Sequence, residues 1–314
     1  MPWSKAAVTL VAMGKWVEVS DGSQPAAEVA AQILQLRMQV VQQMLPLAAH
    51  EYHRDIEHVH QLRVGCRRAG AALQAFRPLL RGKAKRLRKW LRKLRRAAGP
   101  ARDADVLLER LQAEPSTKSS HAYLVARLEQ RRLDVQRAVV DVAEQAETGQ
   151  LDESVERCLT SLRNRSADGP TLRFDLYARE ALRTASRGMF ELAELEQPTV
   201  AQLHQLRIAG KRLRYSIELF HSAFPVALRE EVYPLVEKIQ SRLGRLNDHA
   251  TAQALFQHWL TDLPPAERAA QLAERIVEEH EAIEKVRRDF LQWWTTQRVA
   301  ALESHLSTLL HGSK

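Results

Sequence analysis

The apolar residues of this 314-residue chain follow one rhythm that occurs twice. From His60 to Phe76 (HQLRVGCRRAGAALQAF) they recur at steps of four and three residues, which places them on one face of a helix. The same rhythm returns 144 residues later, from His204 to Phe220 (HQLRIAGKRLRYSIELF). The apolar seams are Leu62, Cys66, Ala69, Leu73 and Phe76 in the first copy, and Leu206, Gly210, Leu213, Ile217 and Phe220 in the second. The chain is therefore predicted to contain an internal duplication.

Helical patterns of the same kind fill most of the remaining sequence, and no run of alternating strands occurs. A short strand over residues 15–19 is the one exception that we expect. The predicted helices cover residues 26–49, 55–76, 83–98, 121–148, 151–163, 172–195, 227–243 and 248–261, with one starting at 102, the second copy ending before 225, and a helical pattern from 265 to about 310.

Glycine and proline are expected to end several of these helices. Gly99 and Pro100 are predicted to end the helix over 83–98. Gly244 is predicted to mark the equivalent helix end in the second half. Asp103 and Asp248 follow these breaks at equivalent positions. Two roles stay open for them: they cap the next helices, or they orient neighbouring arginines.

These elements predict an all-α fold of two antiparallel four-helix bundles, related by an internal pseudo-twofold axis. Residues 1–25 are expected to form a lead-in that is poorly ordered or holds the short strand. The first helical-bundle repeat is expected over residues 26–165, and the second over residues 166–314. If the duplicated helices face one another, their polar faces line a basic groove or pore at the centre.

The distribution of charge adds a functional expectation. The formal net charge is +9 and the pI is near 9.8. Between Arg54 and Arg102, sixteen lysines and arginines stand against two acids, so the rest of the chain is net acidic by about five. A solubilising surface would spread its charge. The concentrated block therefore predicts a polyanionic partner, either nucleic acid, an anionic membrane or a phosphate polymer.

The predicted helix over 83–98 is the most charged part of this block, with nine lysines and arginines and no acid. Leu87, Leu91, Leu94 and Ala98 nevertheless keep the apolar rhythm. Like charges at i,i+4 each cost a few tenths of a kcal/mol, a penalty that a bound anion would remove. We expect a core helix with a cationic outer face.

The repeated HxxRxxx(R/K)R helix, the GPARDADVL segment and the later LGRLND segment together resemble the CHAD family, the conserved histidine α-helical domain. The resemblance runs from about Ala26 to about Leu310. It implies two four-helix bundles that bind inorganic polyphosphate in a basic central pore, in the cytoplasm and at polyphosphate granules. Many members of the family are fused to a triphosphate tunnel domain with an ExExK motif. This sequence has no such motif, so a non-catalytic role is expected.

The resemblance also implies which residues bind phosphate. In the first copy they are His60, Arg63, Arg67 and Arg68, and in the second copy His204, Arg207, Lys211, Arg212 and Arg214. Lys85, Arg88, Lys89, Arg92 and Arg96 join them because they share one face of the basic helix. Arginine can hold two phosphate oxygens and lysine supplies a mobile point charge, so such a surface would bind any run of phosphates.

The main alternative is a protein that binds RNA or DNA backbones, and weak nucleic-acid binding is expected in either case. Base readout and single-strand binding usually need polar or aromatic side chains among the cations, and Trp90 is the one aromatic residue over 83–98. Trp293 and Trp294 either pack in the core or form a partner surface. Oligomeric state and protein partners stay open.

Catalysis, cofactors and metals are not expected. The sequence has no GxSxG, P-loop or HExxH motif, and the basic block lacks carboxylates for Mg²⁺. His50, His53, His58 and His60 crowd together, but no cysteine or carboxylate set completes a metal site. The two cysteines lie far apart, which fits a reducing compartment. The apolar run over 6–14 is too short to span a bilayer and is not expected to be a secretory signal.

Overall fold

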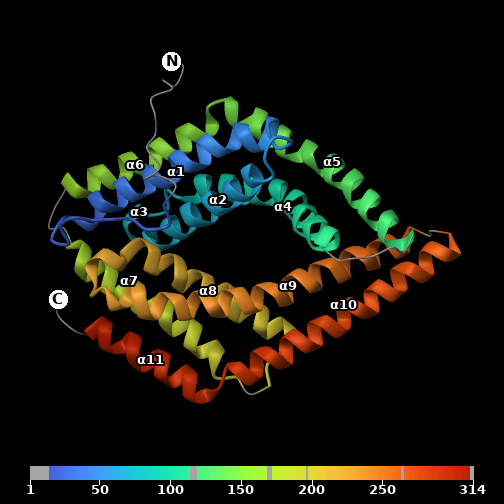
Figure 1. The fold of residues 1–314 in the computed structure, drawn as a ribbon. Coiled ribbons are helices and arrows are strands. Elements are labelled where there is room, and N and C mark those ends of the chain that lie inside the picture. Colours follow the sequence, from blue (N-terminus) through green and yellow to red (C-terminus); the bar gives the residue numbers. More distant parts are fainter. Residues whose placement is uncertain (1–13, 114–118, 168–171, 196, 263–264, 312–314) are drawn as a thin grey trace. The chain divides into compact units, whose positions relative to one another are not determined.

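A computed structural model describes residues 14–113, 119–167, 172–195, 197–262 and 265–311. Over these residues the regular structure is helical, with a single isolated β-bridge and no strand, so the predicted all-α class is confirmed (Figure 1). The α-helices are α1 (Ala26–His50), α2 (Glu57–Ala75), α3 (Arg77–Leu80), α4 (Lys85–Ala113), α5 (Ser119–Glu147), α6 (Gln150–Ala167), α7 (Phe174–Ala193), α8 (Val200–Phe220), α9 (Tyr233–Thr261), α10 (Ala266–Trp293) and α11 (Thr296–His311). A 3₁₀ turn (His221–Ala223) and a π-helical turn (Leu228–Val232) connect α8 to α9.

The two predicted helix breaks are wrong. Helix α4 continues through Gly99 and Pro100, and α9 continues through Gly244, so Asp103 and Asp248 lie inside helices and cap neither. A proline inside a helix costs about 3 kcal/mol, because it lacks one N–H and its ring crowds the preceding turn. Buried apolar residues on both sides of Pro100 keep one stripe in register, and their packing outweighs this local penalty.

Two further expectations about the ends of the chain are corrected. Residues 15–19 form no strand: the Val17 amide donates one hydrogen bond to the Glu218 carbonyl at 3.2 Å, without further pairing. The helical pattern from 265 to 310 is divided, since α10 ends at Trp293 and α11 begins at Thr296. The apolar run over 6–14 lies outside the described residues except for Gly14.

The chain forms two compact units that interleave along the sequence. Unit 1 comprises Met1–Gly99, Arg137–Ala181 and Tyr215–Val226, and unit 2 comprises Pro100–Gln136, Leu182–Arg214 and Ala227–Lys314. Helices α4, α5, α7 and α8 therefore each contribute to both units. The division of the sequence into repeats at residue 165, the paired bundles, the pseudo-twofold axis and the central pore stay predictions.

The core of unit 1 contains an aromatic cluster in which the two copies of the duplicated sequence meet. Phe76 and Phe220, the equivalent last residues of the two copies, contact edge to face with ring centroids 5.6 Å apart. Phe174 lies 5.7 Å from Phe220, and Tyr177 lies 5.8 Å from Phe76. All seam residues of both copies are buried, as the rhythm predicted. The duplicated helices thus present the same face to the protein interior.

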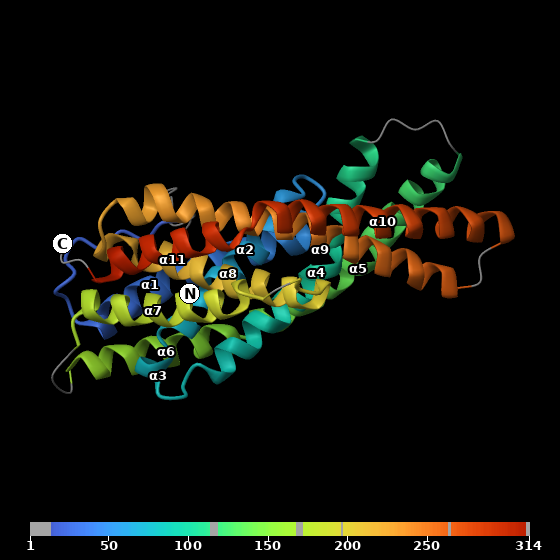
Figure 2. The ribbon, with the colours of Figure 1, turned by 90° about the horizontal axis from the view of Figure 1, so that it is seen from below.

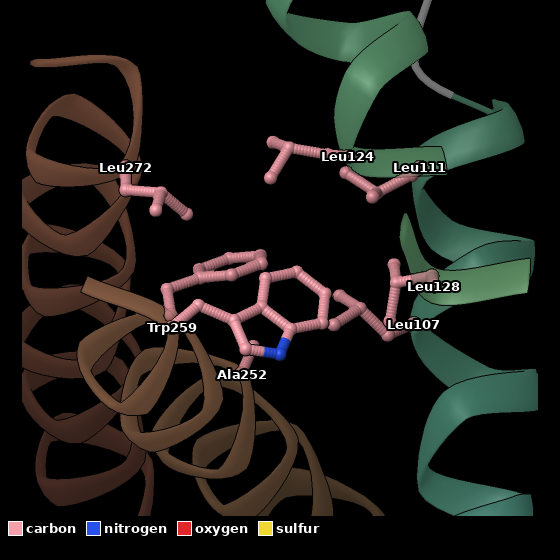
Figure 3. Close-up of a cluster of buried hydrophobic side chains, with 8 residues drawn as sticks. Leu107, Leu111, Leu124, Leu128, Ala252, Trp259 and Leu272 are labelled. Atoms are coloured by element: carbon pink, nitrogen blue, oxygen red, sulfur yellow. The ribbon is translucent and has the colours of Figure 1, made fainter. Parts of the chain in front are cut away.

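The core of unit 2 contains a cluster supplied by two helical hairpins (Figure 3). Its members are Leu107 and Leu111 of α4, Leu124 and Leu128 of α5, Ala252, Phe256 and Trp259 of α9, and Leu272 of α10. Helices α9 and α10 run side by side along much of their length (Figure 2). The Phe256 and Trp259 rings, 5.8 Å apart, fill the space between the hairpins. The second half of α4 is therefore a core helix of unit 2, which explains why it continues past Pro100.

Candidate polyanion-binding surface

The first half of α4 has a buried seam and a fully cationic outer face. Leu87, Leu91, Leu94 and Ala98 are buried, which anchors the helix in unit 1. The five predicted phosphate-binding residues of this helix, Lys85, Arg88, Lys89, Arg92 and Arg96, are all exposed. None of the five forms an ion pair within the described part of the chain. Their charges are uncompensated, as an anion-binding surface requires.

The motif arginines of α2 attach to the same helix. The Arg63 Nη1 group donates a hydrogen bond to the Arg95 carbonyl of α4 at 3.2 Å. Gly99 makes room for this contact, because a Cβ atom there would lie 3.0 Å from Arg63 Nη1. Arg67 Nε donates to the Arg63 carbonyl at 3.3 Å, one turn back along α2. Helices α2 and α4 therefore join their cationic faces within unit 1.

The buried Cys66 thiol reports the electrostatics of this junction. Burial raises the pKa of Cys66 to about 12, while the nearby Arg95, Arg63 and Arg67 guanidinium groups act in the opposite direction. Three guanidinium groups thus lie close enough to one buried thiol to act on its charge. The thiol itself stays protonated at neutral pH, so it is a packing residue and not a nucleophile.

Arg68, the last residue of the first motif, forms an ion pair within unit 1. Its Nε donates to the Glu218 carboxylate at 2.9 Å, with the two side chains 16% and 1% exposed. A buried carboxylate needs such a partner, because an isolated charge there would lose its hydration. The Arg68 charge is therefore largely compensated. His60, one turn before Arg63, is half-buried.

The second motif lies on the first part of α8, in unit 2, and faces more acids. His204 and Arg212 are exposed, and Lys211 is half-buried. Arg214 lies 3.9 Å from the Glu237 carboxylate. Arg207 acts on Asp248: burial raises the pKa of this aspartate, and Arg207 opposes the shift.

Asp103 and Asp248 line the same cavity of about 300 Å³ in unit 2. Asp103 also raises the pKa of Asp248 by repulsion of like charge. Of the two roles left open by the sequence, capping is excluded because both residues lie inside helices. The proximity of Asp248 to Arg207 favours the other role, in which the aspartate orients an arginine.

Sequence reasoning missed two acids that face predicted cations, namely Glu218 and Glu237. Glu218 directly follows the seam residue Ile217, and an acid beside a buried seam was the available signal for a buried ion pair. Arg95 was also missed as a member of the surface. It lies off the face shared by Lys85 to Arg96, and only its contact with Arg63 brings it into the junction.

The described residues offer neither a candidate metal site nor a candidate membrane-spanning helix. No group of three or more histidine, cysteine or carboxylate side chains lies there in an arrangement that could hold a metal ion. No described helix combines the length and apolar character needed to cross a bilayer.

A sequence profile of the CHAD domain matches residues 32–257. The chain belongs to the CHAD domain family. The crystal structure of the CHAD domain from the plant Ricinus communis is similar, with a TM-score of 0.68, 21% sequence identity and 95% coverage of each chain. PptA from Streptomyces chartreusis is also similar, with a TM-score of 0.61, 18% identity, and coverage of 86% of this chain and 99% of that chain. These similarities establish a shared fold. No match was found among curated proteins.

Proposed function

We propose that this CHAD domain binds inorganic polyphosphate without catalysing a reaction, through a basic central pore lined by the duplicated helices, and that this binding places it at polyphosphate granules in the cytoplasm. The observation that carries the proposal is the exposed, uncompensated cationic face of α4. The contact of Arg63 with the Arg95 carbonyl extends this face onto α2. Fourteen residues of the predicted site, from both motifs and α4, are proposed to contribute.

The geometry of α4 suits a repetitive anion. From Lys85 to Arg96 the cations recur at steps of about one helical turn, so the face extends roughly 16 Å at 1.5 Å per residue. A linear polymer with a charge on every unit can contact all of them at once. Each neutralised phosphate releases counterions, which gives high affinity and strong dependence on salt. Phosphate oxygens are bound without any readout of sequence.

The arrangement of side chains argues for binding in place of turnover. Phosphoryl transfer needs carboxylates that hold Mg²⁺ next to the phosphates. The residues from Lys85 to Arg96 include no acid, and the junction around Cys66 is set by three arginines. The surface therefore supplies charge and hydrogen-bond donors, while it lacks the groups that would activate a nucleophile.

A competition titration tests the proposal. Labelled long-chain polyphosphate would be bound at about 150 mM salt and competed with DNA, RNA and pyrophosphate at equal phosphate concentration. The wild type would be compared with an Arg63/Arg67/Arg207/Lys211→Ala variant. We expect polyphosphate to be preferred by about tenfold or more, and the variant to lose most of this preference. Equal competition by DNA or RNA would instead support the general nucleic-acid-binding alternative.

A matched control separates the predicted site from net charge. The Arg137/Arg163/Lys285/Arg288→Ala variant also removes four cations, two from each unit, all of them exposed. None of the four belongs to the predicted site. We expect this control to retain polyphosphate affinity within about threefold. If both variants weaken binding equally, affinity follows total charge and the proposed site is wrong.

A further inference from the structure

Unit 1 contains a second positively charged feature, a cavity of about 880 Å³ that shares no residue with the predicted polyphosphate site. It lies where α3 packs against α6, near the start of α7 (Figure 1). Its volume falls within the roughly 300–1,000 Å³ that is typical of small-molecule sites. The cavity is therefore large enough for a ligand of nucleotide size.

Four cations line this cavity: Arg81, Lys83, Arg157 and Arg165. None of them forms an ion pair within the described part of the chain. Glu156 is the one acid among the described lining residues, and it lies 3.9 Å from the Arg163 guanidinium. Four cations against one acid raise the potential of the cavity and favour an anionic ligand.

Helix α6 supplies one wall through a polar stripe. Arg157, Ser161 and Asn164 follow each other at steps of four and three residues, so they share one helix face. All three line the cavity, while Cys158 and Leu162 on another face are buried in the core. The wall thus combines charge with hydroxyl and amide groups, which can donate hydrogen bonds to phosphate oxygens.

The opposite wall comes from a turn in an unusual backbone conformation. Arg81 follows α3 with φ +42°, and Gly82 continues with φ +81°, so two consecutive residues are left-handed. For a non-glycine residue this conformation costs roughly 1–2 kcal/mol. The turn places both Arg81 and Lys83 at the cavity, and the Lys83 carbonyl accepts a hydrogen bond from Cys158 Sγ of α6 at 3.6 Å. Strain of this kind is typical of ligand sites.

The other described lining residues are apolar, except for Glu156 and Thr160. Leu79, Leu172 and Tyr177 contribute side chains to the lining, together with the first residues of α1. The Tyr177 hydroxyl donates to the Ala75 carbonyl at 2.6 Å, and its ring stacks on Phe76, so the ring is held in place. A ligand that satisfies the whole cavity therefore carries negative charge at one end and a flat or apolar group at the other.

We propose that this cavity binds a phosphorylated small molecule of nucleotide size. Its phosphate groups lie against the four cations and the polar stripe of α6, and its flat apolar part lies against Leu79, Leu172 and Tyr177. The same phosphate chemistry could come from a short polyphosphate, so the test compares the two sources. The inference does not rest on the proposed polyphosphate function, because the two sites have no residue in common.

The test is isothermal titration calorimetry of the full chain with ATP, tripolyphosphate and adenosine. We expect ATP to bind about tenfold or more tightly than either of the others, because it alone has both parts. Arg157→Glu reverses one lining charge and is expected to weaken ATP binding about tenfold or more. Arg163→Glu is the matched control: it makes the same change on the same helix, outside the lining, and should change affinity less than about threefold.

Two further variants keep the outcomes distinct. Ser161→Trp places a bulky ring against the polar stripe without changing charge and should weaken ATP binding about tenfold or more, while its thermal unfolding reports whether the fold survives. The Arg63/Arg67/Arg207/Lys211→Ala variant should bind ATP like the wild type, since it alters only the polyphosphate site. The proposal is overturned if ATP shows no saturable binding at millimolar concentration, if tripolyphosphate binds as well as ATP, or if Arg157→Glu and Arg163→Glu weaken binding equally.

Discussion

Helices α4 and α9 are equivalent elements of the two copies, and they share their buried face but not their charge. The buried pairs, 145 residues apart, are Leu87 and Val232, Leu91 and Val236, Leu94 and Ile239, and Ala98 and Leu243. On the outside, Lys85–Arg96 of the first copy carries only cations, whereas the equivalent positions 230–241 carry three glutamates and one lysine. Packing demands the same apolar rhythm in both copies, but it leaves the solvent face free to differ. The proposed polyanion binding is therefore expected to be stronger on the first copy.

The contacts between the duplicated helices differ in a second way. In the first copy the Arg63 side chain of α2 donates to the Arg95 carbonyl of α4. In the second copy the direction is reversed, because the Gln240 side chain of α9 donates to the Arg207 carbonyl of α8 at 3.1 Å. Gln240 is the equivalent of Arg95, and Arg207 is the equivalent of Arg63. In both copies a side chain of one helix therefore donates to a backbone carbonyl of the other, but the donor comes from the opposite helix.

The largest expected effect concerns the charged faces of α4 and α9. An Arg88/Lys89/Arg92→Ala variant should weaken polyphosphate binding about 100-fold and reduce the slope of log affinity against log salt by about 2. The matched variant in the second copy, Lys238/Arg242/Arg245→Ala, removes three cations from α9 and should weaken binding less than about fivefold. Titrations at several salt concentrations measure both quantities. Equal losses would mean that the two copies contribute alike.

The next effect concerns stability and compares Arg68 with its equivalent, Arg212. Arg68→Ala removes a buried ion-pair contact of Glu218 and should lower the free energy of unfolding by about 3 kcal/mol. Arg212 is exposed, so Arg212→Ala should change it by less than about 0.5 kcal/mol. Urea denaturation provides both values. An Arg68→Met/Glu218→Leu variant should recover most of the loss, and failure to do so would argue against an uncompensated charge as its cause.

A smaller effect is expected at Gly210, which lies next to the Gln240 side chain that donates to Arg207. A Cβ atom at Gly210 would lie well inside contact distance of Gln240 Nε2, so Gly210→Ala should destabilise the protein by about 1–3 kcal/mol. Gly188 lies in a helix with nothing within 4 Å of its added Cβ, and Gly188→Ala should stabilise by about 0.5–1 kcal/mol. Thermal unfolding monitors both. The penalty of Gly210→Ala should shrink in a Gln240→Ala background, where the clash is absent; an unchanged penalty would place the strain elsewhere.

The smallest effect is a pH dependence from Asp248. Desolvation raises its pKa in the folded protein above the ordinary value of 3.8, but the residue is exposed, so folding favours the protonated form only weakly. The protein therefore loses stability as pH rises from about 3.8 through the folded-state pKa. Asp248→Asn should remove this loss, with a gain below about 1 kcal/mol at pH 7 and none below pH 3.8. The exposed Asp289→Asn serves as the control, and identical pH profiles for both variants would contradict the assignment.

The sequence by itself determined the buried faces of the duplicated helices, the all-α class and the family. Apolar residues recur at steps of four and three from Leu62 to Phe76 and from Leu206 to Phe220. Each series lies within one helix, so the local pattern was sufficient to predict the buried face. The cationic face of α4 was also predictable from the sequence, because the lysines and arginines lie opposite the apolar seam and must therefore face the solvent. The duplication itself needed nothing more than the repeated letters.

The tertiary structure decided what depends on partners far away in the sequence. Pro100 was expected to end a helix. Helix α4 instead continues past it, because residues after Pro100, such as Leu107, pack in the apolar cluster of unit 2. Arg68 belongs to the predicted phosphate site, and only the fold shows that Glu218, 150 residues away in the sequence, is an ion-pair partner of it. A local feature such as a proline inside a helix costs a few kcal/mol. Packing and ion pairing between distant residues contribute free energies of similar size and can outweigh this cost. Which cations stay uncompensated is therefore settled only when the chain has folded.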